Sequence, residues 1–145
     1  MASRSCIDTS VLIYAEARDA PAKQRASLNL LRQLLEDATG VLPTQVLQEY
    51  CNVALKKLKL PAHHVRAQLD VFEQFEQFEV IQITPAIIRI GLDLHQTRSL
   101  AFFDTIIVAS AQTAGCAGLL SKVLNTGEIM AGVRMVNPFA NLPPV

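Results

Sequence analysis

The chain has 145 residues, half of them hydrophobic and 18% charged, a composition that excludes an intrinsically disordered protein. Thirteen basic and thirteen acidic side chains cancel, so any contact with nucleic acid must come from a local basic patch. The apolar runs are too short to cross a bilayer.

The first half of the chain predicts an alternation of strands and helices. Residues 5–14 are apolar and rich in β-branched side chains, which predicts a buried strand interrupted by Asp8. Apolar positions at helical spacing predict helices over 21–38, 44–58 and 61–75, with a short strand over 41–43. Pro21 and Gly40 bound the first helix, and we expect Thr44 to cap the second.

The second half continues this alternation. A strand is expected over 80–83, and Thr84 followed by Pro85 predicts the start of a helix. A very apolar helix over 103–114 ends at Gly115, and strands are expected over 118–120 and 133–136. We therefore expect a single α/β domain over 1–145, with a mainly parallel central sheet flanked by helices on both faces.

Two acidic residues lie in apolar surroundings. A lone buried carboxylate costs several kcal/mol, so Asp8, followed by the hydroxyls of Thr9 and Ser10, is interpreted as part of a ligand site at a strand end. The alternative is that Asp8 caps a turn or pairs with an arginine. Asp104 could similarly cap the apolar helix. Glu49 lies on the polar line of its helix and would be unremarkable on its own.

Four segments with these acids occur in a recognisable order: CIDTSVLIYAE, LPTQVLQEYCNVALKK, ITPAIIRIGLDLHQTRSLAFFDTIIVASAQTAGCAGLLS and GVRMVNPF. They resemble the PIN domain family, specifically the VapC-type toxins of bacterial and archaeal toxin–antitoxin pairs, over nearly the whole chain. The resemblance implies a PIN-like three-layer fold and a metal-dependent ribonuclease that hydrolyses RNA phosphodiester bonds. It also implies a homodimer and a cognate antitoxin that blocks the active-site groove.

The same resemblance assigns the acids. Asp8, Glu49 and Asp104 match the family's catalytic, metal-binding carboxylates, and the cofactor would be Mg²⁺ or Mn²⁺. These hard cations bind carboxylate oxygens, activate water and neutralise charge on phosphate. Without a cation, three neighbouring carboxylates repel one another, so a purely structural purpose does not explain why they would be clustered. We expect hydroxyl groups to support the site: Thr9, Ser10 and Ser121.

One position departs from the family pattern. VapC-type chains often carry a segment resembling Leu-x-Ser-Glu-Asp-Leu, whereas this chain reads LLSKVL over 119–124. Lys122 and Val123 therefore stand where acids are expected, and Lys122 is expected to compete with a cation for the carboxylates. Two alternatives are open: a nuclease with three acids, or a catalytically weakened PIN domain that acts as an RNA- or protein-binding module.

The remaining expectations concern RNA and location. Five basic residues are candidates for contact with the RNA backbone, although such clusters are usually solvated faces: Lys56, Lys57, Lys59, Arg98 and Lys122. Three dispersed cysteines without disulfide or zinc spacing, and a start unlike a secretory signal, predict a cytoplasmic protein. A further alternative is an unrelated small-molecule or nucleotide-binding α/β domain. It is disfavoured because the sequence has no Gly-rich phosphate-binding loop.

Overall fold

The computed structural model describes residues 3–74, 77–122 and 126–142, and within them six strands form one sheet in the order β3-β2-β1-β4-β6-β5. Neighbouring strands run parallel, except that β5 and β6 are antiparallel. The expected mainly parallel sheet is confirmed. The strands have these bounds: β1 Ser5–Ile7, β2 Gly40–Pro43, β3 Phe78–Ile81, β4 Gly118–Leu120, β5 Ile129–Met130 and β6 Val133–Val136.

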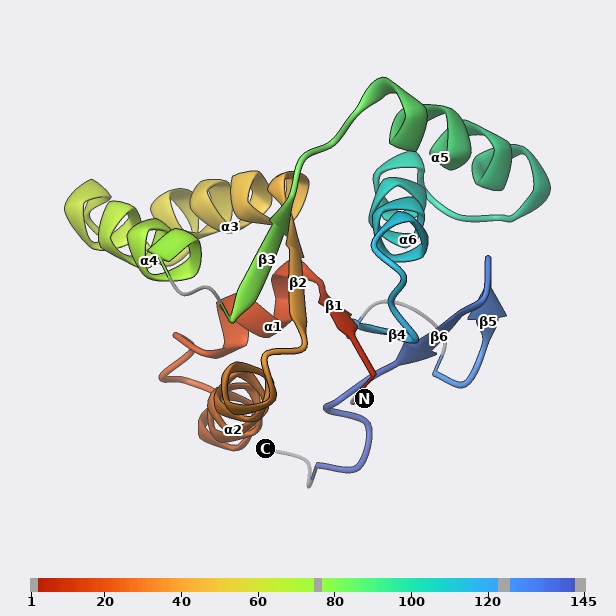
Figure 1. Cartoon of the computed structure of the whole chain (residues 1–145). Coiled ribbons are helices and arrows are strands. Elements are labelled where there is room, and N and C mark those ends of the chain that lie inside the picture. The colour runs from red at the N-terminus through yellow and green to blue at the C-terminus, as the bar shows by residue number, and fades with distance from the viewer. Residues whose placement is uncertain (1–2, 75–76, 123–125, 143–145) are drawn as a thin grey trace.

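Helices cover both faces of this sheet, which confirms the three-layer fold (Figure 1). One side carries α5 and α6, and α6 packs against β1, β2, β4 and β6. The opposite side carries α1 to α4, with α2 and α3 packed against β2. No described helix is long and apolar enough to span a membrane. The helices have these bounds: α1 Thr9–Tyr14, α2 Pro21–Asp37, α3 Thr44–Lys56, α4 Ala62–Gln74, α5 Pro85–Thr97 and α6 Phe102–Thr113.

The first strand is shorter than the sequence predicts. β1 ends at Ile7, and Asp8 is the N-cap of α1, with extended backbone angles of φ −83° and ψ 162°. The strand prediction is therefore wrong after residue 7, because a short apolar run cannot distinguish a buried strand from a buried helix by periodicity. This correction places Asp8 at the junction between the carboxyl end of β1 and the first turn of a helix.

Three other local features differ from expectation. Thr44 does not cap α3 but is its first residue, and its hydroxyl accepts a hydrogen bond from the backbone N–H of Ile83 at 3.2 Å. Asp104 is not the cap of α6, because Ala101 holds that position. β5 is an additional strand, which forms a hairpin with the expected strand β6. The two turn residues of this hairpin, Ala131 and Gly132, have φ values of 52° and 77°, which suit a tight two-residue hairpin turn.

Candidate active site

The elements of the site meet at one edge of the sheet. Asp8 follows β1, α3 with Glu49 follows β2, and Ser121 follows β4. Since β1 lies between β2 and β4 and all three are parallel, their carboxyl ends lie together. This is where ligands gather in open α/β sheets. Asp104 reaches the same region from the first turn of α6, which packs against these strands.

Asp8 is a buried carboxylate held by two hydrogen bonds. Its Oδ1 accepts from the backbone N–H of Thr9 at 2.7 Å, and its Oδ2 accepts from the hydroxyl of Ser121 at 2.6 Å. Burial raises the pKa of Asp8, these hydrogen bonds oppose the rise, and the charges of Glu49 and Asp104 add to it. The carboxylate is thus oriented by the fold but lacks full compensation for its charge.

Thr9 connects Asp8 to Glu49. Its backbone N–H bonds Asp8, while its hydroxyl donates to Oε2 of Glu49 at 2.8 Å. The other carboxylate oxygen of Glu49, Oε1, accepts from Nε2 of Gln45 at 2.9 Å, one helical turn earlier. Both carboxylate oxygens of Glu49 are therefore held by hydrogen bonds, one of them from Thr9.

Gln45 is a residue of this network that the sequence analysis did not single out. Its side chain is buried, and its Nε2 also donates to the backbone carbonyl of Phe103 at 3.0 Å. It consequently joins α3 to the first turn of α6, next to Asp104. The spacing of four residues between Gln45 and Glu49 was the available signal, since residues i and i+4 share one face of a helix.

Asp104 completes the group of interacting charges. It is half-buried, and its pKa is raised first by burial and then by the charge of Glu49. Asp8, Glu49 and Asp104 are therefore close enough for their charges to act on one another. Repulsion at a partly buried site destabilises the ionised forms of Asp8 and Asp104 unless a cation is present.

The donor chemistry of this site fits a hard divalent cation. In the described part of the chain, no three acidic, histidine or cysteine side chains are gathered closely enough to act together as direct ligands of one ion. Mg²⁺, however, is usually bound through one or two carboxylates and several waters. The oxygens of Asp8, Glu49 and Asp104 suit such a site and would hold the ion directly or through water.

Ser10 and Lys122 lie beside the acids without joining them. The backbone N–H of Lys122 donates to the hydroxyl of Ser10 at 3.1 Å. The ammonium group of Lys122 donates to the hydroxyl of Tyr14 and lies 5.0 Å from the centroid of its ring. The structure thus directs the charge of Lys122 toward Tyr14, and competition between Lys122 and a cation for the carboxylates stays a prediction. Val123 lies outside the described residues.

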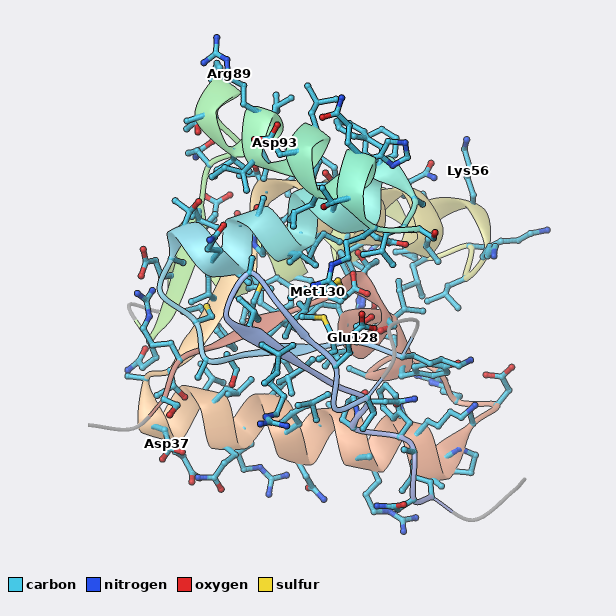
Figure 2. All side chains as sticks on the ribbon, turned by 90° about the vertical axis from the view of Figure 1, so that its right-hand side faces the viewer. Asp37, Lys56, Arg89, Asp93, Glu128 and Met130 are labelled. Atoms are coloured by element: carbon cyan, nitrogen blue, oxygen red, sulfur yellow. The ribbon has the colours of Figure 1, made fainter. Side chains whose placement is uncertain are left out.

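The other basic candidates, which all lie in the described part of the chain, form no ion pair with the three acids. Arg98 is paired with Glu128, with 3.1 Å between Nη1 and Oε1. Lys56, Lys57 and Lys59 are exposed around the C-terminal end of α3, and Figure 2 shows Lys56 extending away from the body of the protein.

A cleft near these lysines does not include the acids. It has a volume of about 650 Å³ and is lined in part by Glu16, Lys57 and His64. Glu16 accepts a hydrogen bond from the hydroxyl of buried Tyr50 at 2.6 Å, and its other oxygen lies 2.5 Å from Nε2 of His64. This network joins the end of α1 to α3 and α4, so His64 has a structural contact rather than a place among the acids.

Solved structures of similar fold include bacterial toxin–antitoxin proteins. A toxin–antitoxin complex from Klebsiella pneumoniae matches at 23% identity and a TM-score of 0.64, covering 92% of this chain and 97% of that chain. FitAcB from Neisseria gonorrhoeae matches at 20% identity and 0.65, covering 94% and 99%. The sarcin–ricin loop cleaving toxin VapC20 of Mycobacterium tuberculosis matches at 14% identity and 0.64, covering 79% and 86%.

Comparison with curated proteins gives no match. The family model described as PIN domain matches residues 5–126. The match includes the three acids, Thr9, Gln45 and Ser121. On this evidence the chain belongs to the PIN domain family.

Proposed function

We propose that this protein is a metal-dependent endoribonuclease and the toxin of a toxin–antitoxin pair. The observation that carries the proposal is the placement of Asp8, Glu49 and Asp104 at the carboxyl edge of a PIN-family sheet, where hydrogen bonds orient Asp8 and Glu49. A fold gains nothing in stability from holding three carboxylates together, whereas a cation site requires them. In this proposal the three acids bind Mg²⁺ or Mn²⁺.

The side chains around the acids would keep them ready for a cation. Thr9, Ser121 and Gln45 donate hydrogen bonds to carboxylate oxygens, the atoms that a cation also prefers, and so fix the orientation of Asp8 and Glu49. Each carboxylate oxygen has a second lone-pair direction free for a metal or a water. A bound divalent ion would activate water and neutralise charge on the phosphate of the RNA.

The proposed partners follow from the structural relatives. The Klebsiella pneumoniae structure is described as a toxin–antitoxin complex, and the Mycobacterium tuberculosis protein is described as a toxin that cleaves the sarcin–ricin loop. We extend an antitoxin partner, an RNA substrate, a homodimer and a cytoplasmic location to this chain as part of the proposal. An apolar cleft beside the acids supports a protein partner, since exposed Ile88 and Phe103 both line it, and Phe103 is 64% exposed.

A second candidate function is a binding module with weakened catalysis. Two points favour it: the resemblance of LLSKVL to the family's Leu-x-Ser-Glu-Asp-Leu segment implies an acid where Lys122 stands, and no set of three direct metal ligands occurs among the described residues. Such a protein would bind RNA or a protein partner with little hydrolysis.

Cleavage of RNA by the purified protein separates these functions. Mn²⁺ should support cleavage, EDTA should stop it, and Asp8→Asn, Glu49→Gln and Asp104→Asn should each lower it by at least about 100-fold. The matched control is Asp93→Asn, which changes an exposed acid of α5 that is not part of the site (Figure 2) and should cleave normally. If the native chain cleaves no RNA with Mn²⁺ but Val123→Asp does, the binding module is the correct function.

A structure determined with Mn²⁺ provides an independent test. The ion should bind to Asp8 and Asp104, with Glu49 in direct contact or connected through water. Acids separated by more than about 10 Å around no ion would contradict the nuclease, because direct bonds to hard cations are only about 2.0–2.6 Å long.

A further inference from the structure

Two lysine ammonium groups lie over the same tyrosine ring. Nζ of Lys23, in the first turns of α2, and Nζ of Lys122, just after β4, are each 5.0 Å from the ring centroid of Tyr14. The Tyr14 hydroxyl also accepts a hydrogen bond from Lys122. Phe139 packs against the Tyr14 ring, with 4.9 Å between centroids, so the ring has a fixed position at the end of α1.

These two positive charges have no acidic partner in the described part of the chain. The ion pairs found there join Arg4 to Glu79, His64 to Glu16 and Arg98 to Glu128. Partial burial alone would raise the pKa of Tyr14, but hydrogen bonds and charges from Lys122 and Lys23 outweigh it and lower the pKa. The surface around Tyr14 therefore has a concentrated positive potential that a bound anion would neutralise.

This basic group lies directly beside the acids. Ser121, the residue before Lys122, donates its hydroxyl hydrogen to Asp8, and the backbone N–H of Lys122 donates to Ser10 in the first turn of α1. The same short helix therefore carries the cap Asp8 at one end and Tyr14 at the other. An RNA chain passing the acids at the start of α1 can reach the lysines at its end.

We propose that Lys23, Lys122 and Tyr14 form a subsite for the RNA backbone, which binds a phosphate neighbouring the one held at the acids. The subsite rests on the proposed function and extends it to substrate binding. Two ammonium groups supply charged donors to the phosphate oxygens, and the Tyr14 ring holds both of them in place through cation–π contact. The lysine at the position of the missing acid thereby acquires a function of its own.

Binding of a fluorescein-labelled single-stranded RNA oligonucleotide, followed by anisotropy in EDTA at several salt concentrations, tests the subsite without cleavage. Lys23→Gln/Lys122→Gln should weaken binding by about fivefold or more. It should also reduce the slope of log Kobs against log salt by about 0.7, the value for one lost contact with a single-stranded phosphate. Lys23→Arg/Lys122→Arg retains both charges and should preserve most of the slope.

The matched control is Arg89→Gln, which removes one exposed charge at the far end of α5 and should bind as the native chain does (Figure 2). Thermal unfolding checks that each variant is folded, and the single variants Lys23→Gln and Lys122→Gln replace the double variant if it does not fold. Unchanged affinity and slope in a folded glutamine variant overturn the subsite while the nuclease stands. A native chain that neither binds nor cleaves RNA overturns both proposals.

Discussion

The hydroxyl of Ser121 donates a 2.6 Å hydrogen bond to Oδ2 of Asp8, which joins the end of β4 to the end of β1 across 113 residues of sequence. Both side chains are buried, at 1% and 6% exposure, so water cannot replace the bond easily. This contact opposes the rise in the pKa of Asp8 that burial causes. The hydrogen bond therefore stabilises the sheet edge and favours the ionised form of Asp8, which is the form that binds a cation.

Ser121→Ala should lower the free energy of unfolding by about 1–3 kcal/mol, because it leaves a buried carboxylate oxygen without its donor. It should also raise the pKa of Asp8 further, so that Mn²⁺ binds more weakly at neutral pH. Urea unfolding and calorimetric Mn²⁺ titration measure these effects. The control is Ser110→Ala, which removes another buried hydroxyl whose bond stays within α6. Equal Mn²⁺ affinity in both variants would contradict the role of Ser121.

Gln45→Met keeps the length of the side chain but removes both of its hydrogen bonds, to Glu49 and to the Phe103 carbonyl. Because residues that orient metal ligands typically contribute about 10–100-fold to affinity or activity, we expect a decrease of that size in Mn²⁺ affinity and in RNA cleavage. Calorimetry and a cleavage assay measure the two quantities. Gln48→Met, an exposed position on the same helix, should leave both unchanged. Normal Mn²⁺ binding by a folded Gln45→Met variant would show that Gln45 does not position Glu49.

The metal-free protein should become less stable as the pH rises toward neutral. Burial and neighbouring charges raise the pKa values of Asp8 and Asp104 above their ordinary value near 3.8, so the folded state binds protons more tightly than the unfolded state does. The resulting stabilisation is present below the ordinary pKa and is lost as the pH rises through the raised values.

Urea unfolding in EDTA from the ordinary pKa near 3.8 up to neutral pH measures this dependence. The double variant Asp8→Asn/Asp104→Asn should show a flatter profile over this range. Saturating Mn²⁺ should restore the stability of the native chain at neutral pH, by about 2.7 kcal/mol at a concentration 100 times the Kd. Identical profiles for the native chain and the variant would contradict the repulsion between the acids.

Two glycines provide a prediction about packing. A Cβ added at Gly40 would lie 2.4 Å and 2.5 Å from ring atoms of buried Phe78, in the neighbouring strand. Gly40→Ala should therefore destabilise the protein by about 1–3 kcal/mol. At Gly91 the added Cβ would meet Cδ1 of Ile106, the flexible end of a side chain, at 2.6 Å, and alanine favours a helix over glycine. Urea unfolding should give the smaller loss for Gly91→Ala, and the reverse order would contradict this comparison.

Much of this architecture could be predicted from local patterns in the sequence. The helix that begins at Pro85 after the cap Thr84 is confirmed, and so are the long helix from Pro21 and the strands after Gly115. These elements depend on caps, turns and periodicity that operate over a few residues. The order of strands and helices then led to a mainly parallel sheet, which the structure confirms.

The secondary-structure predictions were wrong where the local sequence was compatible with more than one structure. Residues 9–14 are apolar enough for a strand, but they form a helix because Asp8 caps its first turn and α1 packs against α2 and α3. The turn between β5 and β6 uses Ala131 and Gly132, whereas the strong sequence signal for such a turn is Asn-Gly or Asp-Gly. That antiparallel edge strand was therefore not expected.

The sequence by itself determined which residues carry acidic, hydroxyl and basic groups, and the order of elements that brings strand ends to one edge. Only the tertiary structure decided how those groups pair: Ser121 with Asp8, Gln45 with Glu49, and Lys122 with Tyr14 rather than with the acids. The physical reason is that side-chain direction depends on strand register and helix packing between segments far apart in the chain. A motif records the residue types, whereas the hydrogen bonds that orient them depend on the fold.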